Sequence, residues 1–269
     1  MKFFKEFSTF HKYLFSIYAT LNIVIFLIPL FYPGGIAKNL TIIGVLALIS
    51  TLTGLLSSIY TARGQAVAYI WGVFNTATYI FVAWASHAYG QSILYIFFET
   101  PLQLIGYYLW SKNTKNSSSN TVESRRLDKR GWIILIVSFF TIWILYAIFI
   151  SDLPYLLKTF THITIAADKE FIIDSLSSTL TIIAVILTSK RFYEQWHFWI
   201  ASASMGIILF LVSMLRSRTF SLNSFSALTL WSLFLISSIY GLNLWKKLNS
   251  DSNNKEELAK FDKEEFLIK

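Results

Sequence analysis

Long apolar runs and short polar segments alternate along the whole chain. A helix needs roughly 20 mostly apolar residues to cross the hydrocarbon core of a bilayer. Eight runs of about that length cover Tyr13–Tyr32, Leu40–Tyr60, Ala66–Ser86, Ser92–Trp110, Gly131–Ile150, Phe171–Ser189, Trp196–Leu215 and Leu222–Trp245. The pattern predicts an all-α integral membrane protein with eight transmembrane helices.

The composition excludes a water-soluble fold. Hydrophobic residues make up 55% of the 269 residues and charged residues only 14%, whereas soluble domains carry about 25% charged residues. The mean hydropathy is +0.54. Cysteine is absent, which excludes disulfides, iron–sulfur clusters, thiolate zinc sites and a cysteine nucleophile.

The net charge of +8 indicates membrane orientation rather than a nucleic-acid partner, because cytoplasmic loops carry an excess of Lys and Arg. With the N-terminus inside, the cytoplasmic segments contain Lys2, Lys5, Lys12, Arg63, Lys112, Lys115, Arg125, Arg126, Lys129, Arg130, Lys190, Arg191, Lys246 and Lys247. The outer loops contain only Lys38, Lys158, Lys169, Arg216 and Arg218. We therefore expect a multi-pass protein of the cell membrane, in contact with lipid, with both termini in the cytoplasm.

Two sequence echoes indicate an internal repeat. Gly-x-x-Leu-Trp-x-Lys occurs at Gly106–Lys112 and, offset by 135 residues, at Gly241–Lys247, and Arg63 and Arg191 each stand eight residues before a tryptophan. We interpret helices 2–4 and 6–8 as two copies of one unit; the alternative is chance, since Trp followed by Lys is common at membrane interfaces. The fifth helix then restores the orientation of the second copy, which gives a parallel 3+1+3 arrangement with the substrate path between the copies.

This interpretation divides the chain into six parts. They are the N-terminus with an extra first helix (1–38), the first three-helix bundle (39–110), a flexible cytoplasmic linker (111–130), the linker helix with an outer loop (131–168), the second three-helix bundle (169–247) and a cytoplasmic tail (248–269).

Polar residues within the fourth run fall on one helical face. Glu99, Gln103 and Gly106 are four and three residues apart, a spacing that aligns side chains along a helix. Polar groups in hydrocarbon normally face a cavity or a neighbouring helix. Gln103 is therefore a candidate substrate ligand, the alternative being a helix–helix hydrogen bond. Pro101 frees a backbone carbonyl, so Pro101 and Gly106 are a candidate hinge.

The seventh run opens with two tryptophans on one face, Trp196 and Trp199, and Glu194 lies two residues before the first of them. Indole faces suit a planar aromatic ligand or a cationic ring. The alternative is an interfacial aromatic belt. The neighbouring acid favours a binding role.

Further candidate ligands lie on the third and sixth runs. Trp71, Asn75 and Thr78 are four and three residues apart, with Tyr79 adjacent, and an unpaired Asn75 amide would be costly at its depth. Asp174, with Ser178 and Thr181 on the same run, could balance a positive ligand or lie in solvent near the outer surface.

No catalytic or cofactor-binding set is recognisable. The four histidines do not stand at metal-ligand spacing, and the chain contains no glycine-rich phosphate loop or nucleophile elbow. We expect neither enzymatic activity nor a cofactor or metal.

These motifs together resemble the PnuC family of vitamin-precursor transporters. The resemblance rests on Pro101-Leu-Gln-Leu-Ile-Gly-Tyr-Tyr-Leu-Trp110, on Arg191-x-x-Glu-x-Trp-x-x-Trp199 and on Tyr240-Gly-x-x-x-Trp245. It implies a SWEET-like 3+1+3 core with an added N-terminal helix, often as a homotrimer.

The resemblance also implies a substrate and its ligands. Typical members carry nicotinamide riboside by facilitated diffusion, and a separate cytoplasmic kinase traps it by phosphorylation. Trp196 and Trp199 would stack on the substrate ring, and Gln103 and Asn75 would hydrogen-bond it. The alternatives are thiamine, riboflavin or a deoxyribonucleoside as substrate, or a substrate-binding subunit of an ATP-driven importer.

Overall fold

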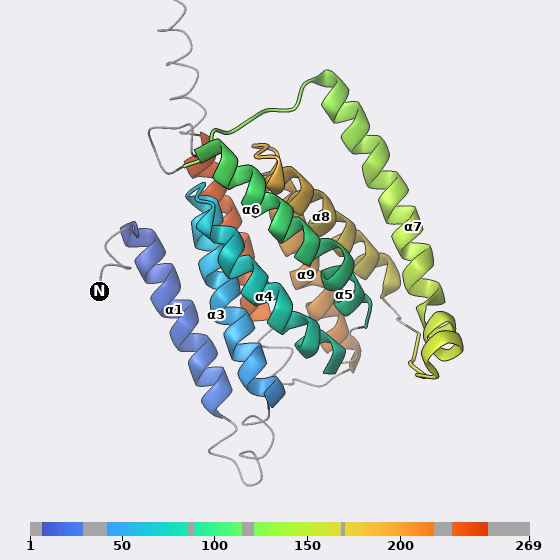
Figure 1. Ribbon diagram of the computed structural model, residues 1–269. Helices are drawn as coiled ribbons and strands as arrows, with labels where there is room; N and C mark the ends of the chain where they lie inside the picture. The colour runs from blue at the N-terminus through green and yellow to red at the C-terminus, as the bar shows by residue number, and fades with distance from the viewer. Residues whose placement is uncertain are drawn as a thin grey trace, which may run out of the picture.

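The computed structural model describes residues 7–28, 42–85, 89–114, 121–167, 170–217 and 228–246. Helices make up most of this part of the chain, which confirms the all-α prediction (Figure 1). They are α1 (Thr9–Leu27), α3 (Ile42–Ala62), α4 (Val67–Ala85), α5 (Tyr89–Leu94), the π-helix η3 (Tyr95–Glu99), α6 (Thr100–Thr114), α7 (Lys129–Thr161), α8 (Phe171–Ser189), α9 (Gln195–Ser217) and a last helix, Leu228–Lys246.

Six of these helices are long and apolar enough to cross a membrane, namely α1, α3, α4, α7, α8 and Leu228–Lys246. The fourth predicted span is instead a continuous series of three segments, α5, η3 and α6. The fifth predicted span, Gly131–Ile150, is part of a longer helix, because α7 has 33 residues and continues through Pro154. The predicted tail, 248–269, lies outside the described residues.

The helices form two groups of three, with α1 and α7 at the periphery. In the first group α4 packs against α3 and α6, and in the second α8 packs against α9. The last helix joins the second group, because the Trp196 side chain of α9 lies against Gly241. Helix α1 packs on α3, and α7 packs on α8 (Figure 1).

The turn after α3 and the turn after α8 have the same backbone geometry. Gly64 and Arg191 both adopt left-handed φ values, +67° and +63°. The N–H of Gln65 donates to the Tyr60 carbonyl at 3.0 Å, and the N–H of Phe192, 127 positions later, donates to the Leu187 carbonyl at 2.9 Å. An L-residue in the left-handed region costs about 1–2 kcal/mol, so the surroundings must hold Arg191 in this conformation.

Residues 121–127 of the predicted linker hold these two turns together. The N–H of Val122 donates to the Gly64 carbonyl at 2.8 Å, and the N–H of Arg125 donates to the Arg191 carbonyl at 2.9 Å. The N–H of Tyr193 returns a bond to the Arg125 carbonyl at 2.8 Å. We call this segment the strap. The composition predicts a flexible linker here, but backbone hydrogen bonds fix the strap in place.

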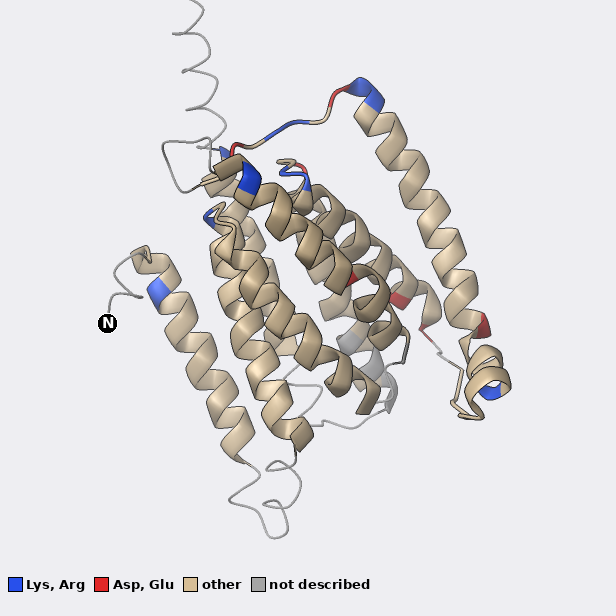
Figure 2. Ribbon diagram, in the orientation of Figure 1, with Lys and Arg blue, Asp and Glu red and all other residues tan. Residues whose placement is uncertain are grey.

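We call the end of the molecule at which the strap lies the strap end. Figure 2 shows that Lys and Arg gather there, on the strap, on the starts of α1 and α7, and on the ends of α3, α6 and α8. The described residues concerned are Lys12, Arg63, Lys112, Arg125, Arg126, Lys129, Arg130, Lys190, Arg191 and Lys246. Such an asymmetry is the structural counterpart of the predicted orientation signal.

Candidate functional site

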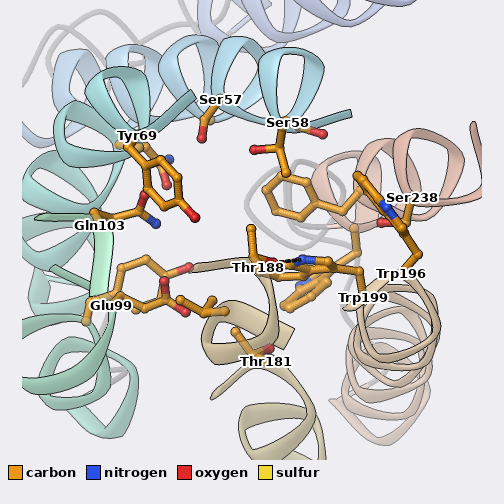
Figure 3. Close-up of a pocket in the computed structure, with 18 residues that line it drawn as sticks. Ser57, Ser58, Tyr69, Glu99, Gln103, Thr181, Thr188, Trp196, Trp199 and Ser238 are labelled. Atoms are coloured by element: carbon orange, nitrogen blue, oxygen red, sulfur yellow. Dashed lines mark hydrogen bonds between the residues drawn. The ribbon is translucent and has the colours of Figure 1, made fainter. Parts of the chain in front are cut away.

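A cavity lies between the two helical groups, and its empty space, counted together with its opening to solvent, is about 870 Å³. The helices α3, α4, η3 and α6 form one side, and α8, α9 and the last helix form the other (Figure 3). The lining residues are Gly54, Ser57, Ser58, Thr61, Tyr69, Gly72, Asn75, Tyr95, Glu99, Gln103, Thr181, Val185, Thr188, Trp196, Trp199, Trp231, Phe234 and Ser238.

Two amide side chains of the first group are positioned by glycines of neighbouring helices. A Cβ atom at Gly54 would lie 2.8 Å from Asn75 Nδ2, and one at Gly72 would lie 2.2 Å from Gln103 Oε1. Asn75 Nδ2 also donates to the Ser50 carbonyl at 2.8 Å. Any larger residue at either glycine would force the amide to move. The glycines therefore leave the space that the two amides occupy in the cavity wall.

Glu99 provides a carboxyl group in the same wall. It is 5% exposed and ends the π-helix η3, in which the N–H of Thr100 donates to the Tyr95 carbonyl. Pro101 has no N–H of its own, so the helix departs from α geometry just where the sequence predicts a break. The Gln103 side chain lies within hydrogen-bonding reach of Glu99, and Figure 3 shows the two residues together beside Tyr69.

The opposite side of the cavity is aromatic. A hydrogen bond holds the Trp199 side chain in place, since its Nε1–H donates to Thr188 Oγ1 at 2.9 Å (Figure 3). Trp196 is almost fully buried, and a Cβ atom at Gly241 would lie 2.3 Å from its ring. Trp231 and Phe234 of the last helix complete this wall. Together they present flat π surfaces opposite the amides and the carboxyl group.

Two donor groups of the lining have no hydrogen-bond partner in the described part of the chain. They are the hydroxyl of Tyr69 and Nε1–H of Trp196, both buried. Buried polar groups in folded proteins are nearly always paired. A ligand with acceptor oxygens would satisfy both donors, which supports this cavity as a binding site.

A cluster of buried aromatic residues separates the cavity from the strap. Tyr69 and Trp196 of the lining pack with Val122 of the strap and with Trp110 and Trp245, which are both 0% exposed. The ring centroids of Trp110 and Trp245 are 5.9 Å apart. Packed aromatic side chains therefore back the cavity wall on the strap side.

Comparison with known proteins assigns the family. A family model described as nicotinamide mononucleotide transporter matches residues 44–247, which is most of the chain. The chain belongs to this family. The match confirms the predicted kinship and covers both helical groups and the strap.

Similar proteins and a solved structure agree with this family assignment. The nicotinamide riboside transporter PnuC of Haemophilus influenzae is 29% identical over 209 residues, covering 77% of this chain and 82% of that protein. The protein of the same name from Neisseria mucosa is 24% identical over 206 residues, covering 76% and 72%. A crystal structure of the vitamin B3 transporter PnuC shares the fold, with a TM-score of 0.67 at 21% identity over 91% of this chain and 94% of that one.

The structure brings together five of the predicted site residues in the cavity lining: Trp196, Trp199, Gln103, Asn75 and Glu99. Gly106 packs against the Tyr69 ring, where a Cβ atom would lie 2.1 Å from Cε1, and Pro101 follows the π-helix. Neither is among the lining residues.

The other four predicted residues lie outside the lining. Glu194 faces the strap, where its Oε1 accepts from the N–H of Leu127 at 3.3 Å. Asp174 and Tyr79 both contact Gln91, at 3.4 Å each. Trp71 packs against the core cluster shared by α1 and α3. Glu194 is two residues before Trp196 but belongs to the turn that precedes α9, where its side chain is directed to the strap.

Sequence reasoning missed most of the hydroxyl and aromatic lining, including Tyr69, Tyr95, Trp231 and Phe234. Tyr69 could have been found from the internal repeat. It precedes Trp196 by 127 positions, which is the offset between the two matching turns, so the two residues occupy equivalent positions in the two copies. The last helix offered none, since Trp231 and Phe234 stand among apolar residues broken only by Thr229 and serines, with no charged or amide residue nearby. In the described part of the chain, no group of three or more His, Asp or Glu could hold a metal ion.

Proposed function

We propose that this protein takes up nicotinamide riboside across the cell membrane by facilitated diffusion, with a separate kinase phosphorylating the product inside. The cavity between the two helical groups carries this proposal, since it combines indole faces with amide, hydroxyl and carboxyl groups. The family assignment and the names of both relatives support it.

The lining favours the riboside over the mononucleotide that the family description names. A phosphate group is normally bound by Arg, Lys or backbone N–H groups. Among the described residues that line the cavity none is Lys or Arg. A phosphorylated ligand would leave its charge uncompensated in a buried site, which is costly.

In the proposed complex the pyridine ring stacks on Trp199 and Trp196. The amides of Asn75 and Gln103 bind the polar groups of the ligand, and serine and threonine hydroxyls surround the ribose. The unpaired donors Tyr69 and Trp196 would bind ligand oxygens. Each base–aromatic stack contributes roughly 1–3 kcal/mol.

The membrane arrangement is part of the same proposal. We assign α5–η3–α6 and α9 as the two spans beyond the six apolar helices, which gives an extra first helix and a parallel, SWEET-like 3+1+3 core. The equivalent turns at Gly64 and Arg191 support the repeat. The basic strap end would face the cytoplasm together with both termini, Pro101 and Gly106 would serve as the hinge, and the unit in the membrane would be a homotrimer.

Counterflow in proteoliposomes that contain only the purified chain tests the function. Internal unlabelled nicotinamide riboside should drive uptake of the labelled compound without ATP or an ion gradient, whereas nicotinamide mononucleotide should not exchange. Exchange of thiamine, riboflavin or a deoxyribonucleoside in place of nicotinamide riboside would overturn the substrate assignment. No exchange of any of them would overturn the transporter assignment.

A further inference from the structure

We propose that Glu99 makes this site selective for positively charged rings, so that the transporter distinguishes a pyridinium nucleoside from a neutral one of the same shape. This inference rests on the proposed function and concerns the same cavity. Beyond the proposed function, it specifies that the preferred ligand is positively charged and that Glu99 interacts with this charge.

Glu99 has the one carboxyl group among the described residues that line the cavity. It is 5% exposed, and no described Lys or Arg side chain lines the cavity to balance it. Asp174, the other acidic residue that the sequence suggests as a counter-charge, bonds Gln91 outside the lining. A positive ligand would therefore meet its counter-charge at Glu99.

The aromatic wall across the cavity favours the same kind of ligand. Indole faces attract cations through the negative potential above the ring. Trp196 and Trp199 stand on one side of the cavity and Glu99 on the other, as Figure 3 shows. A flat cation between them would have a π face on one side and a carboxylate on the other.

Desolvation then determines which ligand is preferred. A buried charge without a partner is costly, whereas two opposite charges that are buried together compensate each other. A cationic ring beside Glu99 stabilises the carboxylate and gains an attraction that a neutral ring of the same shape does not. The N-linked pyridinium of nicotinamide riboside is such a ring.

Two ligands of the same shape test this inference. Nicotinamide riboside carries a positive ring, and benzamide riboside replaces the ring nitrogen by carbon and is neutral. Binding of both to the full chain in detergent can be measured by isothermal titration calorimetry. We expect wild type to bind the cation roughly ten- to a hundredfold more tightly than the neutral analogue.

Glu99→Gln keeps the size and hydrogen-bonding capacity of the side chain and removes its charge. We expect it to reduce the preference to less than about threefold, chiefly by weakening the binding of the cation. Glu99→Asp, which retains the carboxylate, should keep a preference. Asp152→Asn removes the same charge from the exposed surface of α7 and should leave the ratio unchanged.

Equal affinity of wild type for the two ribosides, or an undiminished preference in a folded Glu99→Gln variant, would overturn the inference. If wild type does not bind nicotinamide riboside but prefers thiamine, which also contains a cationic ring, over neutral riboflavin, the substrate assignment fails and the charge selection stands. A lack of binding to both cationic ligands would overturn both.

Discussion

Trp110 and Thr188 join the two helical groups, since the indole N–H of Trp110 in α6 donates to the Thr188 carbonyl at the end of α8, at 2.9 Å. The reverse contact also exists. Trp245 of the last helix donates to the Ala62 carbonyl at the end of α3, at 3.1 Å. Each group thus supplies an indole to the last turn of the other, where helix carbonyls lack an intrahelical partner. The two tryptophans of the repeated Gly-x-x-Leu-Trp-x-Lys motif therefore have the same structural role.

We expect Trp110→Phe and Trp245→Phe each to lower the stability of the protein. Phenylalanine keeps an apolar ring but has no N–H, so each change removes one buried hydrogen bond and leaves a smaller ring. The loss should be about 1–3 kcal/mol per site, seen as a lower thermal midpoint in detergent. Trp132→Phe on α7, where the side chain is 41% exposed, is the matched control. An equal loss in the control would contradict this assignment.

Gly72→Ala should weaken substrate binding without unfolding the protein. The new Cβ atom would lie 2.2 Å from Gln103 Oε1, so Gln103 must leave its place in the cavity wall. We expect roughly a tenfold loss of affinity, comparable to one lost hydrogen bond. In a Gln103→Ala background the same glycine substitution should cost little, and a full additional loss there would show that Gly72 acts by another route.

Trp199→Ala and Trp196→Ala should each reduce affinity by roughly one aromatic stack, about 1–3 kcal/mol. Trp199→Phe should lose less, because it keeps a ring but not the bond to Thr188 Oγ1. Titration calorimetry measures the effect, with Trp132→Ala on the exposed face of α7 as control. Unchanged affinity in both folded variants would mean that the pair is only an interfacial belt.

Amide hydrogen exchange should reveal the strap in the intact protein. The N–H groups of Val122 and Arg125 lie outside the helices but are bonded to carbonyls of the two turns, so their exchange should be slowed well below the rate of an unstructured peptide. Mass spectrometry of a peptide covering residues 121–127 measures this. Exchange at the unstructured rate would show that the strap is free in solution.

Two quantities decide whether a residue of α4 reaches the cavity: the direction in which its side chain leaves the helix, and its position along the helix axis. The sequence gives the first but not which position along the axis lies at the cavity. Each residue turns an α-helix by about 100°, so Tyr69 and Asn75 lie within about 60° of Gly72 and share the cavity-facing side of α4. Trp71 lies about 100° away and contacts the first core cluster instead. Tyr79 shares the direction but lies about one turn beyond Asn75, where it reaches Gln91.

The apolar runs, in contrast, determine the helices by themselves, and polar residues such as Asn75 and Gln103 stand out within them. What the sequence alone could not show is which helices meet. Trp231 reaches the cavity because α9 has a glycine at Gly206, where a Cβ atom would lie 2.3 Å from the Trp231 ring. Such a pairing between helices depends on tertiary packing, which no single run encodes.

The strap has a mechanical consequence. One short ribbon of backbone is bonded at the same time to Gly64 and to Arg191, so the two halves of the molecule share a common latch. Separating the two turns at this end would require the loss of backbone hydrogen bonds to Gly64 or to Arg191. The strap therefore couples the position of one turn to that of the other.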